Sequence, residues 1–210
     1  MYYGGVLPTF THSTAACPNC HLFLYQRELS YLLHPGFSVR CMCGRRNTIQ
    51  DVAFHLSERA QAHVKTPRRY EWYHATRVPE WLSKVQESDV RVHVGVENAA
   101  WDIILTEADM GITEPFYLWT LRFTQNTIFT STLVQDEDSD SIFPKNTASP
   151  YVNRWEDPGS VSYITPAKWL KAMTVRQVTV EEARARESLF NIFFSEDFQQ
   201  GDLAGNLVTD

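Results

Sequence analysis

The segments Cys17-Pro18-Asn19-Cys20 and Cys41-Met42-Cys43 hold all four cysteines of this 210-residue chain. Two close pairs of thiolates can supply the four corners of a tetrahedral zinc site, and the residues between the pairs suffice for a short hairpin that brings them together. Two disulfides are the alternative, which the absence of a secretory leader and of any other cysteine disfavours. The spacing therefore predicts a zinc-ribbon module over residues 15–48, with zinc ligands Cys17, Cys20, Cys41 and Cys43.

The predicted zinc is structural rather than catalytic. Imidazole also binds zinc, so His21 or His34 can in principle replace a thiolate, but four cysteines already complete the site. A metal enclosed by four sulfurs keeps no position for water or substrate. Because such modules occur in enzymes, nucleic-acid binders and interaction proteins alike, the cysteines predict a fold element and leave the function open.

The composition limits the class of protein. A chain with 43% hydrophobic and 13% aromatic residues can bury one ordinary core beside a small metal-stapled module. A net charge of −6 argues against a protein that coats nucleic acid or an anionic membrane by bulk electrostatics. No apolar run is long enough to span a membrane, and the N-terminus lacks the layout of a signal peptide, so the expected compartment is the cytoplasm. Two basic clusters are either solvated surface or parts of a local groove: Arg40, Arg45, Arg46 and Lys65, Arg68, Arg69.

The N-terminal part is predicted to run from a lead into the metal module and then into a helix. Residues 1–14 read as an extended or disordered lead, and the module is expected to contain strands at 21–27 and 37–41. A connecting helix is predicted over residues 49–66, because four apolar residues recur at helical spacing after Thr48 and Asp51, which resemble a capping box: Val52, Leu56, Ala60 and Val64.

A second, α+β domain is predicted over residues 70–180. Its strongest strand signal is the aromatic run Pro115–Phe123, and residues 135–140 form an acidic loop. The other elements are expected as strands at 71–75, 90–94, 161–165 and 174–180, helices at 79–87 and 97–105, and an apolar stretch at 127–134. Residues 181–210 are predicted to form a C-terminal helix, capped by Thr179 and Glu182, and an acidic tail.

Three polar segments of this domain stand out when they are read together. They are Trp72-Tyr73-His74-Ala75-Thr76, then Val92-His93-Val94-Gly95 before a helix, and the loop Asn153–Ser160 before a strand. Each has an ordinary structural explanation, since a strand histidine usually belongs to the core or surface and Glu156-Asp157-Pro158-Gly159 is a good turn sequence.

The order of these segments resembles the ADP-ribosyltransferase fold, in the branch shared by diphtheria-type toxins and poly-ADP-ribose polymerases, whose first motif is Tyr-His-Gly-Thr. The resemblance covers about residues 70–178. It implies a split β-sheet and a mono-ADP-ribosyltransferase that cleaves the nicotinamide glycosidic bond of NAD and transfers ADP-ribose to a protein or nucleic-acid acceptor. By that resemblance His74 holds NAD, Thr76 supports the loop, His93 or Tyr117 provides the aromatic contact, and Glu156 stabilises the positive charge of the transition state.

The chain departs from the family pattern at three positions. Ala75 stands in place of the glycine, and His93 stands where a tyrosine usually stacks on the nicotinamide. The family carboxylate would fall at Ser162, so Glu156 can serve only if its loop folds back toward the strand, and otherwise the site is built differently.

Other functions remain as alternatives. The sequence has no phosphate-binding loop, dinucleotide fingerprint, nucleophile elbow or His-Glu-x-x-His pattern. A non-catalytic zinc-ribbon module that binds nucleic acid or protein is the alternative from another class. An RNA 2'-phosphotransferase is the enzymatic one, although it is expected to have a more basic groove. Neither the acceptor nor the oligomeric state follows from the sequence.

Overall fold

The computed structural model describes residues 13–20, 38–48, 52–134, 143–154, 156–157 and 159–186, and shows a mixed α+β protein. The strands are β1 (Ser13–Ala16), β2 (Val39–Arg40), β3 (Arg46–Asn47), β4 (Ala53–Leu56), β5 (Trp72–Thr76), β6 (Arg91–Val94), β7 (Phe116–Phe123), β8 (Ser149–Val152), β9 (Val161–Pro166) and β10 (Leu170–Val178). The helices are α2 (Glu58–Lys65), α3 (Trp81–Glu87) and α4 (Glu97–Asp109), with short 3-10 turns at Pro67–Arg69 and Ala167–Trp169. In the described residues, no helix is long and apolar enough to cross a membrane.

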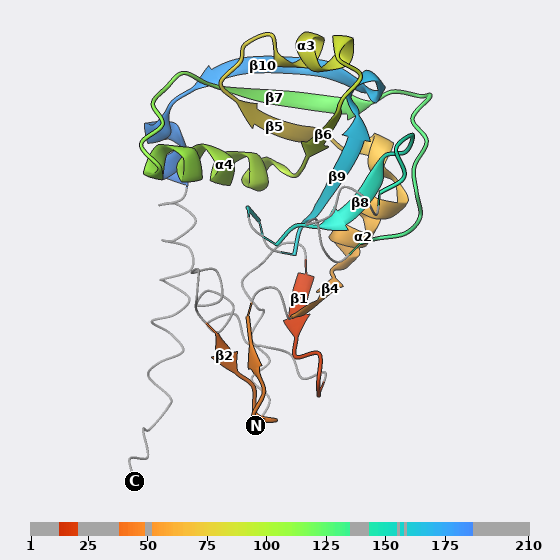
Figure 1. Ribbon diagram of the computed structural model, residues 1–210, viewed down its shortest axis with the longest axis vertical. Helices are drawn as coiled ribbons and strands as arrows, with labels where there is room; N and C mark the ends of the chain where they lie inside the picture. The colour runs from red at the N-terminus through yellow and green to blue at the C-terminus, as the bar shows by residue number, and fades with distance from the viewer. Residues whose placement is uncertain are drawn as a thin grey trace.

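The first three-stranded antiparallel sheet has the order β10-β7-β5 and is covered by a helix on each side (Figure 1). Side chains of successive β7 residues point alternately to the two faces of the sheet, as they do in any strand. Phe116 and Leu118 pack toward Trp101 and Ile104 of α4, whereas Trp119 packs in the cluster that contains Trp81 of α3. This sheet is therefore buried on both faces over β7, which explains why the aromatic run was the clearest strand in the sequence.

The second three-stranded antiparallel sheet has the order β6-β9-β8. It meets the first sheet at a single bridge, where the Tyr73 N–H donates to the Gly95 carbonyl at 2.8 Å and the Gly95 N–H donates to the Tyr73 carbonyl at 3.0 Å. Beyond this bridge β5 and β6 separate into their own sheets (Figure 1). The domain thus has two sheets that diverge from one point, and we call this point the sheet junction.

The predicted connecting helix over residues 49–66 is wrong in its first half. Ala53–Leu56 is strand β4, which pairs antiparallel with β1, and helix α2 begins only at Glu58. Ser57 caps it, because its hydroxyl accepts a hydrogen bond from the Ala60 N–H at 3.2 Å. Helical spacing of Val52 and Leu56 misled the prediction, since the pairing partner of this segment lies about 40 residues earlier in the chain.

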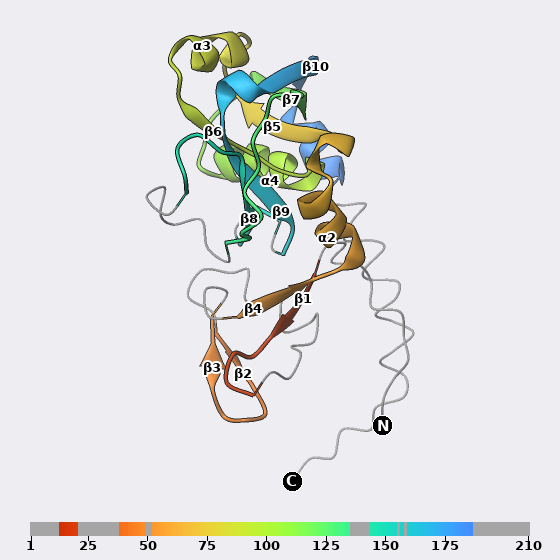
Figure 2. The ribbon, with the colours of Figure 1, turned by 90° about the vertical axis from the view of Figure 1, so that its right-hand side faces the viewer.

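The metal module is a separate small layer below the sheets (Figure 2). It contains the pair β1-β4 and the hairpin β2-β3. Strand β1 starts at Ser13, within the segment predicted as a lead. Of the two strands predicted inside the module, Val39–Arg40 agrees with the second, whereas the first lies outside the described residues.

The main core forms where the two sheets and α3 meet. Trp72 is fully buried and contacts Tyr163 of β9, with the ring centroids 4.8 Å apart in an edge-to-face arrangement. The Trp72 indole N–H donates to the Pro67 carbonyl at 2.9 Å, so this polar atom stays satisfied inside the core. Arg68 closes the same end of the sheet by donating to the carbonyls of Thr124 and Gln125 at 3.3 and 3.1 Å.

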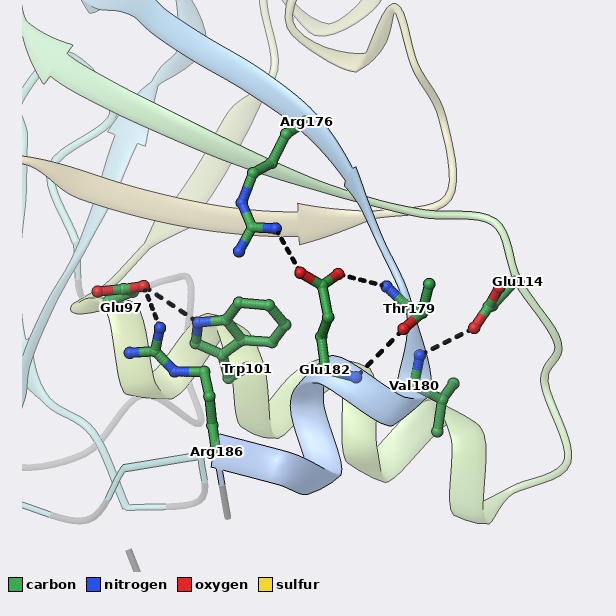
Figure 3. A network of polar contacts seen from close by, with 8 residues as sticks. All are labelled: Glu97, Trp101, Glu114, Arg176, Thr179, Val180, Glu182 and Arg186. Carbon is green, nitrogen blue, oxygen red and sulfur yellow. Dashed lines mark hydrogen bonds and ion pairs between the residues drawn. The ribbon is translucent and has the colours of Figure 1, made fainter. Parts of the chain in front are cut away.

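A polar network ties the C-terminal helical segment (residues 180–186) to the first sheet (Figure 3). The predicted capping box is confirmed: the Glu182 N–H donates to the Thr179 hydroxyl at 3.1 Å, and the Thr179 N–H donates to the Glu182 carboxylate at 3.0 Å. Arg176 and Arg186 both lie over the Trp101 ring, 5.2 and 5.1 Å from its centroid. These contacts anchor the last described segment on α4.

Most other predicted elements differ only at their ends. Helix α4 continues to Asp109, four residues past its predicted end, and β10 begins at Leu170. Strand β8 was not predicted. The apolar stretch at 127–134 makes only isolated bridges, at Phe129 and Val134. The acidic loop 135–140 and the tail beyond residue 186 lie outside the described residues.

Candidate metal centre and sheet junction

The four cysteine sulfurs form a cluster that can hold a metal ion, all within 4.8 Å of one another. The Cys17 and Cys43 sulfurs are 3.7 Å apart and those of Cys20 and Cys41 are 3.3 Å apart, which is too long for a disulfide. Metal–sulfur bonds of about 2.3 Å at tetrahedral angles place sulfurs about 3.8 Å apart. The cluster is therefore the right size for a tetrahedral metal, and it contains every cysteine predicted as a ligand.

The backbone around the second cysteine pair explains how the sulfurs converge. The Gly44 N–H donates to the Cys41 carbonyl and the Cys41 N–H donates to the Arg45 carbonyl, both at 2.8 Å, which closes a tight turn at the end of the β2-β3 hairpin. Gly44 has a φ of +87°, a conformation that glycine adopts without a Cβ clash.

The surroundings of Cys17 favour the thiolate form that a metal requires. Burial raises the pKa of Cys17, but hydrogen bonds from the backbone of Asn19 and Cys20, with side-chain bonds to Cys43 and Asn47, outweigh it and lower the pKa to about 6. The fully buried Asn47 amide has its oxygen 3.7 Å from the Cys17 sulfur, and its nitrogen has no hydrogen-bond partner within the described residues. Turning this amide over presents its N–H to the thiolate, so the site fits a bound cation.

The metal module packs against the end of β8. Val152 lies in one apolar cluster with Cys17, Cys41 and Phe54. The buried Arg154 guanidinium donates to the Val52 carbonyl at 3.1 Å and lies over the Phe54 ring, 5.4 Å from its centroid. The end of β8 and the start of the loop that follows it therefore pack directly on the module that contains the cysteines.

His74 sits at the sheet junction. Its Nδ1 lies 2.9 Å from the backbone carbonyl of His93, and its ring stacks on Trp81 with the centroids 3.8 Å apart and an interplanar angle of 15°. Because a carbonyl only accepts, Nδ1 must carry the proton and Nε2 is left as an acceptor. Desolvation lowers the pKa of His74 to about 4, although the bond to His93 acts in the opposite direction, so the ring is neutral at neutral pH.

Thr76 and Tyr117 lie beside His74 on the same face of the first sheet. Thr76 pairs with Tyr117 across β5 and β7, and His74 pairs with Trp119. The Thr76 hydroxyl accepts from the Val78 N–H at 3.3 Å and so holds the turn after β5. The fold thus brings three of the predicted residues, His74, Thr76 and Tyr117, to one place.

His93 faces away from this group, toward a polar face on the second sheet. Its Nδ1 is 2.9 Å from the hydroxyl of Tyr151, a β8 residue that was not among the predicted site residues. This face carries His93, Tyr151, Asn153 and Ser162 together with the buried Ile164, which is the register partner of His93 and packs with Tyr151 and Phe143. The opposite face of the sheet carries Val92, Val94 and Tyr163 in the core. Only strand register identifies Tyr151, because nothing in its local sequence marks it.

Glu156 lies in the hairpin loop that connects β8 to β9. The Asn153 side chain accepts from the Glu156 N–H at 3.1 Å and donates to the Ser162 hydroxyl at 3.3 Å. The Asn153 N–H also donates to the Ser160 carbonyl at 2.9 Å. Two hydrogen bonds therefore connect Glu156 to Ser162, the position of the family carboxylate. In the described part of the chain no hydrogen bond or ion pair joins the Glu156 carboxylate to His74 or His93.

Asp157, next to Glu156, is held in a different environment. Desolvation raises its pKa to about 7, while the charge of Arg59 on α2 and a hydrogen bond with Ser160 oppose the rise. The surroundings of Asp157 therefore resist its negative charge.

Comparison with protein-family models, with curated proteins and with solved structures yields no match for this chain.

Proposed function

We propose that the chain is an NAD-dependent mono-ADP-ribosyltransferase whose site lies at the sheet junction. The observation that carries this proposal is the contact between the two histidine segments: the His74 ring bonds to the backbone of His93 at the point where two antiparallel sheets diverge. Thr76 and Tyr117 share the face of His74. This arrangement supports the resemblance drawn from the order of the sequence motifs.

The neutral His74 ring is suited to hold a ribose. Its Nε2 can accept a hydrogen bond from a sugar hydroxyl, because Nδ1 already donates to the His93 carbonyl. The indole N–H of the buried Trp119, its cross-strand neighbour, has no hydrogen-bond partner among the described residues. An acceptor and a donor beside the aromatic rings of Trp81 and Tyr117 suit a ligand that combines hydroxyl groups with flat heterocycles.

The reaction proposed is transfer of ADP-ribose. The bond between the ribose C1 and the nicotinamide nitrogen breaks, its electron pair leaves with nicotinamide, and an acceptor nucleophile or water then bonds to C1 and releases a proton. Glu156 would stabilise the cationic ribose, as an anionic carboxylate does for oxocarbenium-like transition states. Its backbone is tied through Asn153 to Ser162 on β9.

We further propose that the metal held by the four cysteines is a structural zinc. Four sulfur donors of this spacing suit zinc, and the Asn47 amide and the backbone bonds to Cys17 favour the thiolate. Since the module packs on the loop that carries Glu156, zinc would also hold that loop in place. Metal analysis of the purified chain should give one zinc per chain, and Cys41→Ser should lose it. A full-length protein that folds without bound metal would contradict this proposal.

The enzymatic proposal is tested with NAD labelled in its adenylate part, incubated with the full chain in the presence and absence of cell lysate. We expect release of nicotinamide and labelling of an acceptor, with Glu156→Gln lowering the rate at least about a hundredfold. Glu181→Gln, which neutralises an exposed carboxylate on the C-terminal helical segment, is the matched control and should leave the rate unchanged. Release that is unaffected by Glu156→Gln would refute the role of that carboxylate, and the lack of both release and NAD binding would refute the activity.

A further inference from the structure

The β2-β3 hairpin of the metal module presents a pair of arginines to solvent. Arg40 and Arg46 are register partners on its two strands, so their side chains leave the same face, and both are exposed. Arg45 is also exposed, next to this pair, and Met42 at the end of the hairpin is 92% exposed. Asn47, the neighbour of Arg46 in β3, points inward and is fully buried. The alternation shows that the arginine face is the outer face of the hairpin.

This pairing is unfavourable for the isolated protein. Like charges directly opposite each other on an antiparallel pair lie about 5 Å apart at Cβ and repel. Within the described residues neither Arg40 nor Arg46 makes an ion pair, although the chain as a whole carries an excess of acidic residues. An anion placed between the two guanidinium groups would remove the repulsion.

Compensation of the metal centre does not account for the pair. A divalent cation with four thiolates carries about two negative charges, which nearby arginines can offset. The side chain that donates to a cysteine sulfur is that of Asn19, 3.5 Å from Cys43, and none of the hydrogen bonds to sulfur in the described part comes from Arg40 or Arg46. The guanidinium groups extend into solvent instead.

We propose that this arginine face binds the phosphate backbone of a nucleic acid. Guanidinium groups match phosphate oxygens with two parallel hydrogen bonds, and two arginines across a narrow hairpin present a compact positive site to a polyanion. The exposed Met42 beside them offers an apolar surface for a base. One exposed methionine is too little apolar surface to anchor the hairpin in a membrane, so a lipid surface is the less suitable partner. The inference does not depend on the proposed transferase activity.

The test is binding of the full-length, zinc-loaded chain to fluorescein-labelled 20-nucleotide single-stranded DNA, RNA and duplex DNA, measured by anisotropy without NAD at several salt concentrations. We expect salt-dependent binding to at least one of them. Arg40→Ala/Arg46→Ala should weaken it at least about tenfold and reduce the slope of log K against log salt by about 1.5, because each phosphate contact contributes about 0.7 to 0.9. Lys145→Ala/Lys171→Ala removes two other exposed positive charges and should leave binding within about twofold.

Zinc content is measured for each variant as a control for folding of the metal module. The variant Arg40→Lys/Arg46→Lys keeps both charges, so it should retain part of the affinity and the full salt slope. Three results would overturn the proposal. The first is that the wild-type chain, at protein concentrations on the order of micromolar and at about 50 mM salt, binds none of the nucleic acids. The others are equal losses of affinity in the alanine and control variants, and stronger binding to phosphatidylserine vesicles or to an acidic peptide than to nucleic acid.

Discussion

Replacing His74 with phenylalanine should give a loss of stability that depends on pH. Phenylalanine keeps a flat ring against Trp81 but removes the hydrogen bond to the His93 carbonyl, which costs about 1 kcal/mol because water can reach the exposed His93. The wild-type chain loses part of its free energy of unfolding in acid. A histidine whose folded pKa is about 4 binds fewer protons than the unfolded chain, whose ordinary value is 6.5, so its contribution is complete above pH 6.5 and is lost as the pH falls toward 4.

The folded and unfolded pKa values of His74 set the size of this pH-dependent change in the free energy of unfolding. Between pH 7.5 and 5.0 a change from 6.5 to about 4 removes at most about 2 kcal/mol from the wild-type free energy of unfolding and nothing from the phenylalanine variant. The stability of His74→Phe relative to the wild type should therefore rise by about 2 kcal/mol between pH 7.5 and pH 5.0. His63 and Asp157 also titrate abnormally, but they are present in both proteins and cancel in the difference.

Urea unfolding followed by tryptophan fluorescence measures this difference, because Trp81 is in contact with the substituted ring. A deficit of the same size at both pH values would refute the neutral, desolvated state assigned to His74. A variant as stable as the wild type at pH 7.5 would refute the structural importance of the bond to His93.

Two further substitutions test the second sheet. Gly95→Ala should destabilise the chain by about 1–3 kcal/mol, because the added Cβ would lie 2.8 Å from the Ser162 hydroxyl and 3.2 Å from the Ala99 Cβ. In a Ser162→Ala background the cost measured by urea unfolding should fall, and an unchanged cost would show that the hydroxyl is not the obstacle. Asp157→Asn should stabilise the chain at pH 8 by about 1–2 kcal/mol, since a carboxyl whose pKa is raised to about 7 favours folding in acid and opposes it once ionised. Thermal unfolding at pH 8 and pH 5 should show that gain shrinking at the lower pH, and a gain of equal size at both would contradict the assignment.

Local patterns predicted the elements whose partners are near in sequence or whose burial is unambiguous. The aromatic run became β7 because both of its faces are covered, and the pair Thr179 and Glu182 caps a helix through bonds within one turn. The segment 53–56 was predicted as helix because its pairing with β1 depends on residues far away. Strand β8 was missed for a different reason. Its four residues are all buried, so its sequence shows no alternation of polar and apolar residues.

The two candidate sites also differ in how far the sequence could predict them. Close spacing of the cysteines was enough to predict that Cys17, Cys20, Cys41 and Cys43 form one cluster, since the soft ligands of a metal site are chemically distinctive. The histidines were marked by their order along the chain, but their contact was not predictable. It arises because β5 and β6 share one bridge and then diverge, which brings the His74 ring to the His93 carbonyl.

The sequence by itself determined that the four cysteines form a candidate metal site, and it determined the α+β character and the strands with strong local signals. Tertiary structure alone decided that Asn153 links the Glu156 backbone to Ser162 of β9, that Arg154 packs on the cysteine module, and that Tyr151 meets His93. Arg40 and Arg46 became a pair only through the register of a hairpin. The physical reason is that metal ligation and strand propensity are written in residue type and spacing, whereas strand register and loop packing depend on surfaces contributed by residues far apart in the chain.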